Sequence, residues 1–480
     1  MDRKRIALFA CAWLLAGAAQ GEVLQGNLEL RWGDGAPAAE ARLAPKFEVA
    51  LALDGGGRIA LDPGQARRGA GDLYALANRR VAVGFSGRKS GGVRMIDAIV
   101  PVDDPATGLP HVRSGKADGV AKATLGATRW MTVACRFSDI AEEQKTVAFF
   151  RDQYGEAEGQ LGHYWREVSY DRINLAGSDA VGWYALPHPR SHYVTEDGEE
   201  EKADLDALFD DCTAAADASV DFSGVIGINM MFNGDLDGYA WGGGRCATLD
   251  GGHRCWSTTW NPPWSFNNLA PLAHEMGHGY GLPHSDNSDG DDDTYDNPWD
   301  VMSDSWSNAV RDAVYGSRPK HINMLQRDRL GWVDAARKRT FDVGTPRTRL
   351  QLDFASLSGA GSAQMLVLQT PSSPDPYSGT FYTVEARRRS GAYEGALAGD
   401  AVIIHRVGSG YRYEAESQDA DRPPADTANN EGSMFKPGEA WISPDGLFTL
   451  YVESGNASGF TVIVGDRGRV TGGDGPRRRK

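Results

Sequence analysis

The sequence predicts an α/β (α+β) fold in which a central domain of mixed helices and strands lies between two β-rich regions. Helical and strand patterns alternate over residues 126–340, whereas short strand patterns separated by turn signals fill residues 22–125 and 341–470. Glycine accounts for 59 of the 480 residues, which favours turn-rich β structure. A chain of this length has room for about two to four domains.

The N-terminus and the net charge indicate an exported protein that does not bind nucleic acid. Residues 1–21 are typical of a signal peptide: a basic segment from Asp2 to Arg5, an apolar run from Ile6 to Leu15, and small residues from Ala16 to Gly21. The apolar run is too short to span a membrane, and no later segment is long enough. The net charge of −15 argues against a nucleic-acid partner. We expect a secreted, extracellular or periplasmic protein without a transmembrane anchor.

Residues 22–125 are expected to form a β-rich N-terminal domain or a pro-region. Phe47–Leu53 alternates like a strand and is followed by a Gly-rich turn, and Val81–Phe85 predicts a second strand. Residues 101–120 are rich in Pro, Gly and Asp, which is typical of a linker.

The central segment, residues 126–340, alternates strand and helix patterns, as in an α/β core. One predicted helix begins near Ala141, because Val147, Phe150 and Tyr154 then share a face. The other expected elements are a buried strand at 130–135, a helix over 201–218, a central strand at 225–232, a helix from Asn267 or Asn268, and a last helix within 319–335.

Beyond residue 340 the pattern returns to short strands and turns, which predicts a C-terminal β-sandwich-like domain over 341–470. The strand candidates are residues 380–385, 401–405, 448–452 and 460–464. The basic tail, residues 471–480, is expected to lie outside the folded domains.

A zinc site is predicted by one motif within the central segment. Residues 274–284 fit the pattern H-E-x-x-H-x-x-G-x-x-H. On a helix, His274 and His278 leave the same face and suit two ligands of one Zn²⁺ ion. Gly281 can turn the chain so that His284 returns as a third ligand, and Glu275 is placed to act as the catalytic general base. The fourth position of the metal stays open for water and substrate.

Met302 follows the third histidine in the segment Asp300-Val301-Met302-Ser303. In zinc proteases with this extended motif, a methionine turn lies beneath the metal. We therefore expect Met302 to form that turn. Four tryptophans near the motif either line the cleft or pack in the core; these are Trp241, Trp256, Trp260 and Trp264.

Four cysteines remain after signal removal, and four allow three pairings. Cys246 and Cys255 flank a Gly-rich turn and are natural partners, which leaves Cys135 with Cys212. Neither pair has C-x-x-C spacing, which argues against a thiolate zinc site.

An acidic loop lies between the third histidine and the methionine turn. It holds eight Asp and no Lys or Arg between Asp286 and Asp304. One interpretation is a Ca²⁺ site that uses Asp289, Asp291 and Asp293. The alternative is a solvated acidic loop, and the absence of a full EF-hand pattern leaves both open.

The motifs resemble those of the metzincin zinc metalloproteases, and most closely the gametolysin and immune inhibitor A families. Four blocks carry the resemblance in residues 126–340, and two more fit the β-domain that follows in bacterial relatives. The blocks are YWREVSYDRINL (164–175), HEMGHGYGLPHS (274–285), WDVMS (299–303), RLGW (329–332), FYTVEARRRSG (381–391) and DAVIIHRV (400–407).

The resemblance implies a twisted sheet with a cleft over the zinc, and an edge strand within 238–260 that binds substrate by strand addition. Astacin-like members carry a tyrosine ligand two residues after the turn methionine, where this chain has Asp304. Residues 22–134 contain no cysteine, so a cysteine switch is excluded.

Together these features predict a secreted zinc-dependent endopeptidase that hydrolyses peptide bonds in proteins, with a protein or peptide as its partner. Two alternatives stay open. One is a secreted binding protein with an idle metal site, against which the retention of Glu275 argues. The other is a zinc peptidase restricted to short peptides.

Overall fold

The computed structural model describes residues 22–37, 43–90, 93–102, 124–198, 200–291, 293–371, 379–408, 413–421 and 430–467. The predicted signal peptide, nearly all of the predicted linker and the basic tail lie outside these residues. The described chain is a strand-rich mixed α/β structure with several sheets, as the sequence predicted. Within it, no helix is both long enough and apolar enough to cross a membrane.

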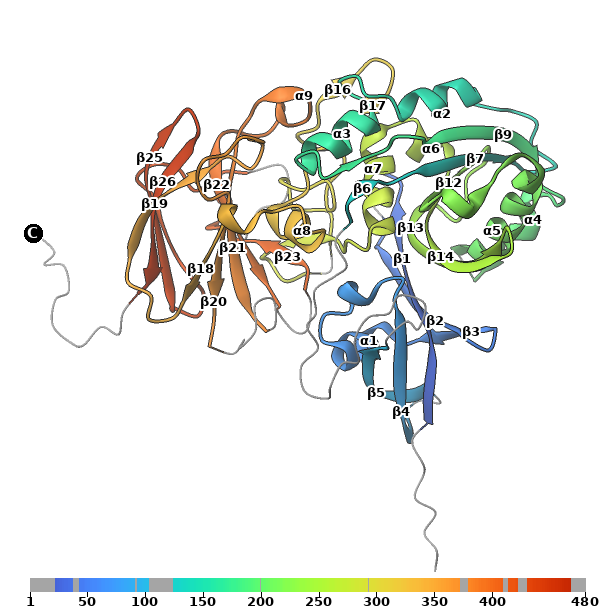
Figure 1. The fold of residues 1–480 in the computed structure, drawn as a ribbon, viewed down its shortest axis with the longest axis horizontal. Coiled ribbons are helices and arrows are strands. Elements are labelled where there is room, and N and C mark those ends of the chain that lie inside the picture. Colours follow the sequence, from blue (N-terminus) through green and yellow to red (C-terminus); the bar gives the residue numbers. More distant parts are fainter. Residues whose placement is uncertain are drawn as a thin grey trace, which may run out of the picture.

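The largest sheet has ten strands and joins the N-terminal region to the central region (Figure 1). The N-terminal strands are β1 (Glu22–Gly35), β2 (Lys46–Leu53), β3 (Arg58–Leu61), β4 (Arg80–Ser90) and β5 (Val93–Pro101). The central strands are β7 (Trp130–Arg136), β9 (Asp179–Ala185), β12 (Gly227–Phe232), β13 (Tyr239–Leu249) and β14 (Gly252–Asn261). β13 pairs antiparallel with both β1 and β14, whereas β12 and β7 pair in parallel with their neighbours. The predicted strands at 47–53, 81–85, 130–135 and 225–232 are therefore present, within two residues at their starts.

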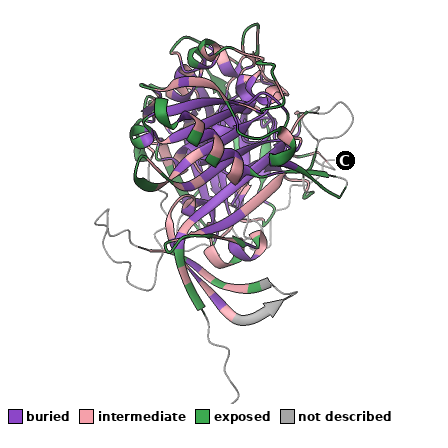
Figure 2. Ribbon diagram, turned by 90° about the vertical axis from the view of Figure 1, so that its right-hand side faces the viewer, coloured by how far each residue is buried: buried purple, intermediate pink, exposed green. Residues whose placement is uncertain are grey.

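Helices cover both faces of the central strands, because side chains alternate along each strand. On β7, Trp130 and Ala134 pack with α2 (Val147–Gln153), α3 (Leu161–Val168) and α7 (Leu269–Gly279). Met131 and Val133 face the other way and pack with α5 (Leu205–Ala216). This gives a buried sheet between two helical layers, visible as purple strands within the body in Figure 2.

The starts of two helices differ from the predictions. The helix predicted over 201–218 is α5, which begins at Leu205, because Glu200–Ala203 form strand β11 and the Asp204 side chain caps the helix. The helix expected from Ala141 begins at Val147, because Thr146 caps it by accepting the Phe149 backbone N–H at 3.1 Å. The last helix, α8 (Met324–Arg329), lies within the predicted range 319–335, as expected, and ends just before Leu330; the Asn323 side chain caps its first turn, and Gly331 lies just beyond it with a φ of +77°.

Two further sheets form the C-terminal region and share one apolar core. The first has the order β15-β23-β22-β21-β20-β18, and the second has the order β19-β26-β25-β24. Their strands are β15 (Ser285–Asn287), β18 (Lys338–Asp342), β19 (Thr348–Asp353), β20 (Met365–Gln369), β21 (Phe381–Arg387), β22 (Ala401–Val407), β23 (Ala415–Ser417), β24 (Ala440–Ile442), β25 (Phe448–Asn456) and β26 (Gly459–Asp466). All four strand candidates beyond residue 340 are present. β15 comes directly after the third histidine, so the C-terminal sheet reaches the metal motif.

The described residues also form four 3-10 helices, Tyr74–Leu76, Asp217–Ser219, Phe222–Gly224 and Ala335–Arg337. The remaining α-helices and strand pairs are short. They are helices α1 (Pro63–Ala70), α4 (Arg190–Tyr193), α6 (Pro263–Phe266) and α9 (Gly391–Glu394), and the strand pairs β6 (Gly126–Ala127) with β8 (Ile173–Asn174), β10 (Val194–Asp197) with β11 (Glu200–Ala203), and β16 (Arg311–Asp312) with β17 (Gly316–Ser317).

Candidate metal centre

The histidine motif lies on the buried helix α7. Leu269, Leu272 and Met276 pack in the core and fix the helix against the sheet. The helix begins after Asn268, one of the two predicted caps, although the Asn268 side chain accepts a hydrogen bond from Ser317 and does not cap the helix. It ends where Gly281 adopts a φ of +87°, a conformation that favours glycine. The chain then turns back and brings His284 toward the helix.

The three predicted histidines converge at their Nε2 atoms. The Nε2 of His278 lies 3.0 Å from that of His274 and 3.1 Å from that of His284. Carbonyl oxygens can only accept, so the contacts of His274 Nδ1 with Val301 O (2.6 Å) and of His278 Nδ1 with Leu282 O (2.7 Å) place a proton on each Nδ1. In the neutral rings the Nε2 lone pairs then face one another.

This tautomer suits metal binding, because a ligating imidazole usually donates its other N–H to a carbonyl or carboxylate. Burial and the two neighbouring imidazoles lower the pKa of His278 to about 3, which keeps this ring neutral. In a tetrahedral zinc site with bonds of 2.0–2.1 Å, donor atoms lie about 3.3 Å apart. The observed nitrogen separations are close to that value, so the group could hold a metal ion.

A fourth donor, Asp34, was not predicted from the sequence. Its Oδ1 lies 2.7 Å from His284 Nε2, and its Oδ2 lies 3.2 Å from the Nε2 atoms of both His274 and His278. Burial raises the pKa of Asp34, but His284 and His274 outweigh this and hold it well below its ordinary value. The carboxylate is therefore charged and completes a group of three nitrogens and one oxygen.

Strand β1 carries Asp34 to this position. β1 pairs antiparallel with β13, with Arg31 opposite Gly243 and Gly35 opposite Tyr239. β13 lies within 238–260, where the resemblance places a substrate-binding edge strand. In this structure the edge of β13 is covered by the protein's own N-terminal region. Glycine permits the close packing beneath it, since a Cβ at Gly242 would lie 2.5 Å from the Glu275 carbonyl oxygen.

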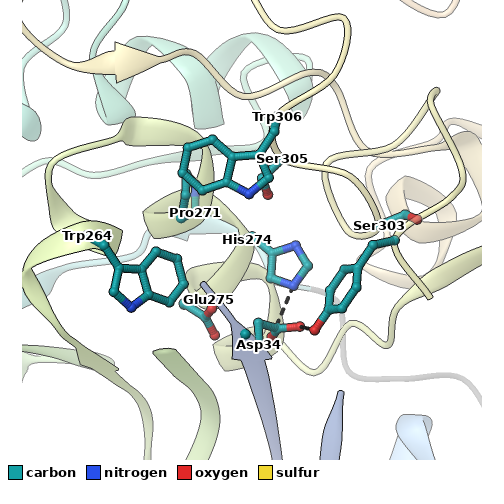
Figure 3. Close-up of a pocket in the computed structure, with 10 residues that line it drawn as sticks. Asp34, Trp264, Pro271, His274, Glu275, Ser303, Ser305 and Trp306 are labelled. Atoms are coloured by element: carbon teal, nitrogen blue, oxygen red, sulfur yellow. Dashed lines mark hydrogen bonds and ion pairs between the residues drawn. The ribbon is translucent and has the colours of Figure 1, made fainter. Parts of the chain in front are cut away.

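Glu275 lies beside the histidines in a small pocket (Figure 3). Its side chain is buried, and its Oε2 has no hydrogen-bond partner among the described residues. Burial, and then the charge of Asp34, raise the pKa of Glu275 well above its ordinary value. The pocket is lined by Asp34, Gly35, Trp264, Pro271, His274, Glu275, Tyr295, Ser303, Ser305 and Trp306. Trp264 thus lines the site, whereas Trp241, Trp256 and Trp260 pack in the core.

Tyr295 is a second pocket residue that was not predicted. Its hydroxyl donates to Asp34 Oδ1 at 2.8 Å, and the preceding residue, Thr294, lies 3.4 Å from His284 Nδ1 through its Oγ1. Burial and the charge of Asp34 raise the pKa of Tyr295 well above its ordinary value, so the hydroxyl keeps its proton. No sequence spacing singles out this tyrosine, because the loop that carries it has no periodic pattern.

Met302 packs against the motif helix at Gly277. A Cβ added at Gly277 would lie 2.4 Å from Met302 Sδ, so the sulfur contacts the helix backbone between the two histidines. The turn is held by the buried Asp300, whose Oδ1 accepts from Met302 N at 2.9 Å. Asp304, two residues on, forms a buried ion pair with Lys320 at 3.1 Å.

Both predicted disulfides are present. Cys135–Cys212 joins β7 to α5, and Cys246–Cys255 joins β13 to β14. Because disulfides persist in oxidising compartments, they suggest an extracellular-type environment.

The acidic loop forms a second group of possible metal donors. The carboxylates of Asp289, Asp291 and Asp296 come together. Asp293, which the sequence suggested as the third donor, lies outside this group and accepts the Tyr295 backbone N–H at 2.9 Å. Asp296 was missed because it lies beyond the regular spacing of the aspartates before it.

No protein-family model matches this chain, and a search of curated proteins finds no similar sequence. The resemblance to zinc metalloproteases therefore rests on the motifs and on the geometry of the site.

Proposed function

We propose that this protein is a secreted zinc-dependent endopeptidase of the metzincin type, in a latent form. The observation that carries the proposal is the convergence of three histidine Nε2 atoms beside Glu275. Residues 126–340 would be the catalytic domain, with β-rich regions on either side. Its motifs resemble those of the gametolysin and immune inhibitor A families.

The donor set fits zinc. His274, His278 and His284 would hold the ion through Nε2, and backbone carbonyls orient two of the rings. Zinc bound there would supply Lewis-acid chemistry, lowering the pKa of water and polarising the scissile carbonyl. Met302 supports the helix that carries two of these ligands.

Glu275 would act as general base and then general acid. It would take a proton from the attacking water, the C–O bond would form, and the same proton would pass to the leaving amine as the C–N bond breaks. A base must be ionised, and the negative charge of Asp34 opposes ionisation of Glu275. Displacement of Asp34 would therefore both open the site and lower the pKa of the base.

Tyr295 would assist once Asp34 has moved. Its hydroxyl donates to an Asp34 oxygen in the position where a substrate oxygen would approach the histidines. A donor at this point could stabilise the negative charge that develops on the carbonyl oxygen. β13 would bind the substrate backbone as an added strand, the place that β1 occupies in the latent form.

The latent form would be maintained by the N-terminal region. β1 fills the edge of β13, and Asp34 fills the fourth donor position. These two contacts favour the interpretation of residues 22–125 as a pro-region. Asp34 would then play the part that a propeptide cysteine plays in a cysteine switch.

Two alternatives make different predictions. A secreted binding protein with an idle metal site would bind zinc without proteolysis. A peptidase restricted to short peptides would cleave those but spare folded and unfolded proteins. The buried, unpartnered Glu275 carboxylate argues against an idle site, because such a group is costly to keep without a role.

The test is casein digestion by the full-length protein, before and after limited trypsin treatment, with and without 1,10-phenanthroline. We expect digestion after treatment, loss of activity with the chelator, and recovery with added Zn²⁺. Glu275→Gln should retain zinc but lose roughly 10² to 10⁴-fold in rate. Casein cleavage that persists in Glu275→Gln at the wild-type rate contradicts the proposal.

A further inference from the structure

A compact group of carboxylates lies in the loop that follows β15. One carboxylate oxygen from each of Asp289, Asp291 and Asp296 lies within 4.8 Å of the other two. The loop is held at its base, because β15 pairs in parallel with β23 and Ser288 Oγ accepts from Asp419 N at 3.2 Å. The group is therefore fixed against the C-terminal region.

One member of the group is buried without a complete set of partners. Asp296 is 2% exposed, its Oδ1 accepts from Asn287 N at 2.9 Å, and its Oδ2 has no hydrogen-bond partner among the described residues. Burial, followed by the charge of Asp286, its side-chain hydrogen bond with Asp296, and the charge of Asp289, raises the pKa of Asp296 to about 9. A buried carboxylate surrounded by other carboxylates is unfavourable unless a cation or proton compensates it.

Among the described residues, no cationic side chain pairs with this group. In the part of the chain that the structure describes, no Lys, Arg or His forms an ion pair with Asp289, Asp291 or Asp296. The sequence contains no Lys or Arg between residues 285 and 304. A cation bound from solution would compensate the group.

We propose that Asp289, Asp291 and Asp296 bind a calcium ion at a site separate from the histidine group. All the donors are oxygens on a loop, which is the set that Ca²⁺ takes with flexible geometry. Zn²⁺ would prefer the nitrogen-rich histidine group, and Mg²⁺ demands a stricter octahedron and retains its waters.

The local structure explains why the carboxylates gather. Asp289 Oδ1 accepts from Asp291 N at 2.9 Å, and Asp291 Oδ1 accepts from Asp293 N at 2.7 Å. These side-chain turns curl the loop and bring the first two carboxylates close together. Asp293 is exposed and follows the same turn pattern without joining the group, which makes it a matched control.

Calcium at this site would order the segment that leads back to the histidines. Thr294 and Tyr295 lie between Asp291 and Asp296 and contact His284 and Asp34, respectively. The site does not depend on peptidase activity, so its test uses binding and stability.

The experiment is calorimetric titration of CaCl₂ into the zinc-loaded full-length protein, with melting measured in parallel. We expect one site with a Kd on the order of 10⁻⁴ M, as in extracellular calcium modules. At a 100-fold excess over Kd, the melting temperature should rise by about 5–10 °C. MgCl₂ or NaCl at matched ionic strength should not reproduce this rise.

Asp296→Asn should abolish both the binding heat and the melting shift while zinc content stays at the wild-type value. Asp289→Asn, at a partly exposed position, should do the same and serves if Asp296→Asn does not fold. Asp293→Asn removes one charge from the same loop and keeps an acceptor oxygen, so it should bind calcium within about twofold of the wild type.

Three outcomes would overturn the site. These are no calcium heat in the wild type, an equal melting shift with magnesium, or loss of the shift in Asp293→Asn to the same extent as in Asp289→Asn. Each would mean that the loop responds to calcium only through general charge screening, or not at all.

Discussion

The N-terminal region (residues 22–102) and the C-terminal region (residues 338–467) both reach the metal centre, but they contact different parts of it. The N-terminal region contributes Asp34, which touches the histidine nitrogens directly. The C-terminal region contacts the segments next to the ligands: β23 pairs with β15, which follows His284, and Ser433 accepts from Trp299, which precedes the methionine turn. In the proposed latent form, the N-terminal region would block the site, and the C-terminal region would support the segments that hold the ligands.

The contacts of the C-terminal region with these segments are buried, and several are ion pairs. Arg387, on β21, pairs with Glu385 at 3.0 Å and also with Glu394, and all three side chains are buried. Glu385 accepts the Met324 backbone N–H at the start of α8. Trp299, before the methionine turn, donates to Ser433 at 2.9 Å. Removing any of these groups would leave a buried partner unsatisfied.

The N-terminal region is held to the central region by the backbone hydrogen bonds between β1 and β13 and by ion pairs nearer the surface. Arg31 pairs with Asp206 of α5 at 2.6 Å, and Arg58 pairs with the same carboxylate at 3.3 Å. Asp206 and Arg58 are each partly exposed, so solvent screens part of their attraction. The N-terminal region also shares an apolar cluster with β20 and β21, so displacing Asp34 is a smaller change than releasing the whole region.

The largest expected effect concerns the buried ion pairs of Arg387 in the C-terminal region. Arg387→Met leaves two buried carboxylates without their cation and should lower the free energy of unfolding by about 3–5 kcal/mol. Chemical denaturation measures this loss. The control is Arg349→Met, which removes an exposed pair with Glu453 and should cost less than about 1 kcal/mol. Equal losses in the two variants would show that the buried network contributes no more than a surface ion pair.

A smaller effect is expected for the contact of Asp34 with the three histidines. Asp34→Ala removes a charged hydrogen-bond acceptor worth about 1.5–3 kcal/mol, so uncleaved protein should gain roughly 10- to 150-fold in peptidase activity. The measurement is hydrolysis of a quenched fluorescent peptide before any trypsin treatment. Asp97→Ala, at an exposed position of the same region, should leave the activity unchanged. If Asp34→Ala stays as inactive as the wild type, β1 alone maintains latency.

The smallest effect is expected for the partly exposed ion pairs of the N-terminal region. Arg58 pairs with the buried Glu29 at 2.6 Å. Without Arg58, Glu29 would still accept a hydrogen bond from Cys246 N at 2.8 Å and pair with Arg31. Arg58→Ala should therefore shift the balance toward the open form by about 1 kcal/mol or less, and the shift should shrink at high salt. The same peptide assay detects it as a rise of up to about fivefold. Arg80→Ala, which removes an ion pair with Asp54 within the N-terminal region, should have no effect.

Local sequence patterns predicted much of the fold. Strand alternation located β2, β7, β12 and the main C-terminal strands, and the motif spacing brought His274 and His278 to one helix face. The disulfides followed from cysteine spacing. The predicted helix start at Ala141 was wrong, because apolar periodicity does not reveal which residue caps the helix.

What the sequence by itself determined is the local chemistry: an i, i+4 pair of histidines, a glycine that turns the chain, and a third histidine in reach. Only the tertiary structure decided the rest. Asp34 lies 250 residues from His284 and meets it through the register of β1 on β13. Tyr295 and Asp296 are positioned by a loop held between α7 and β23. Backbone pairing over such distances depends on the packing of whole sheets, which no local pattern encodes.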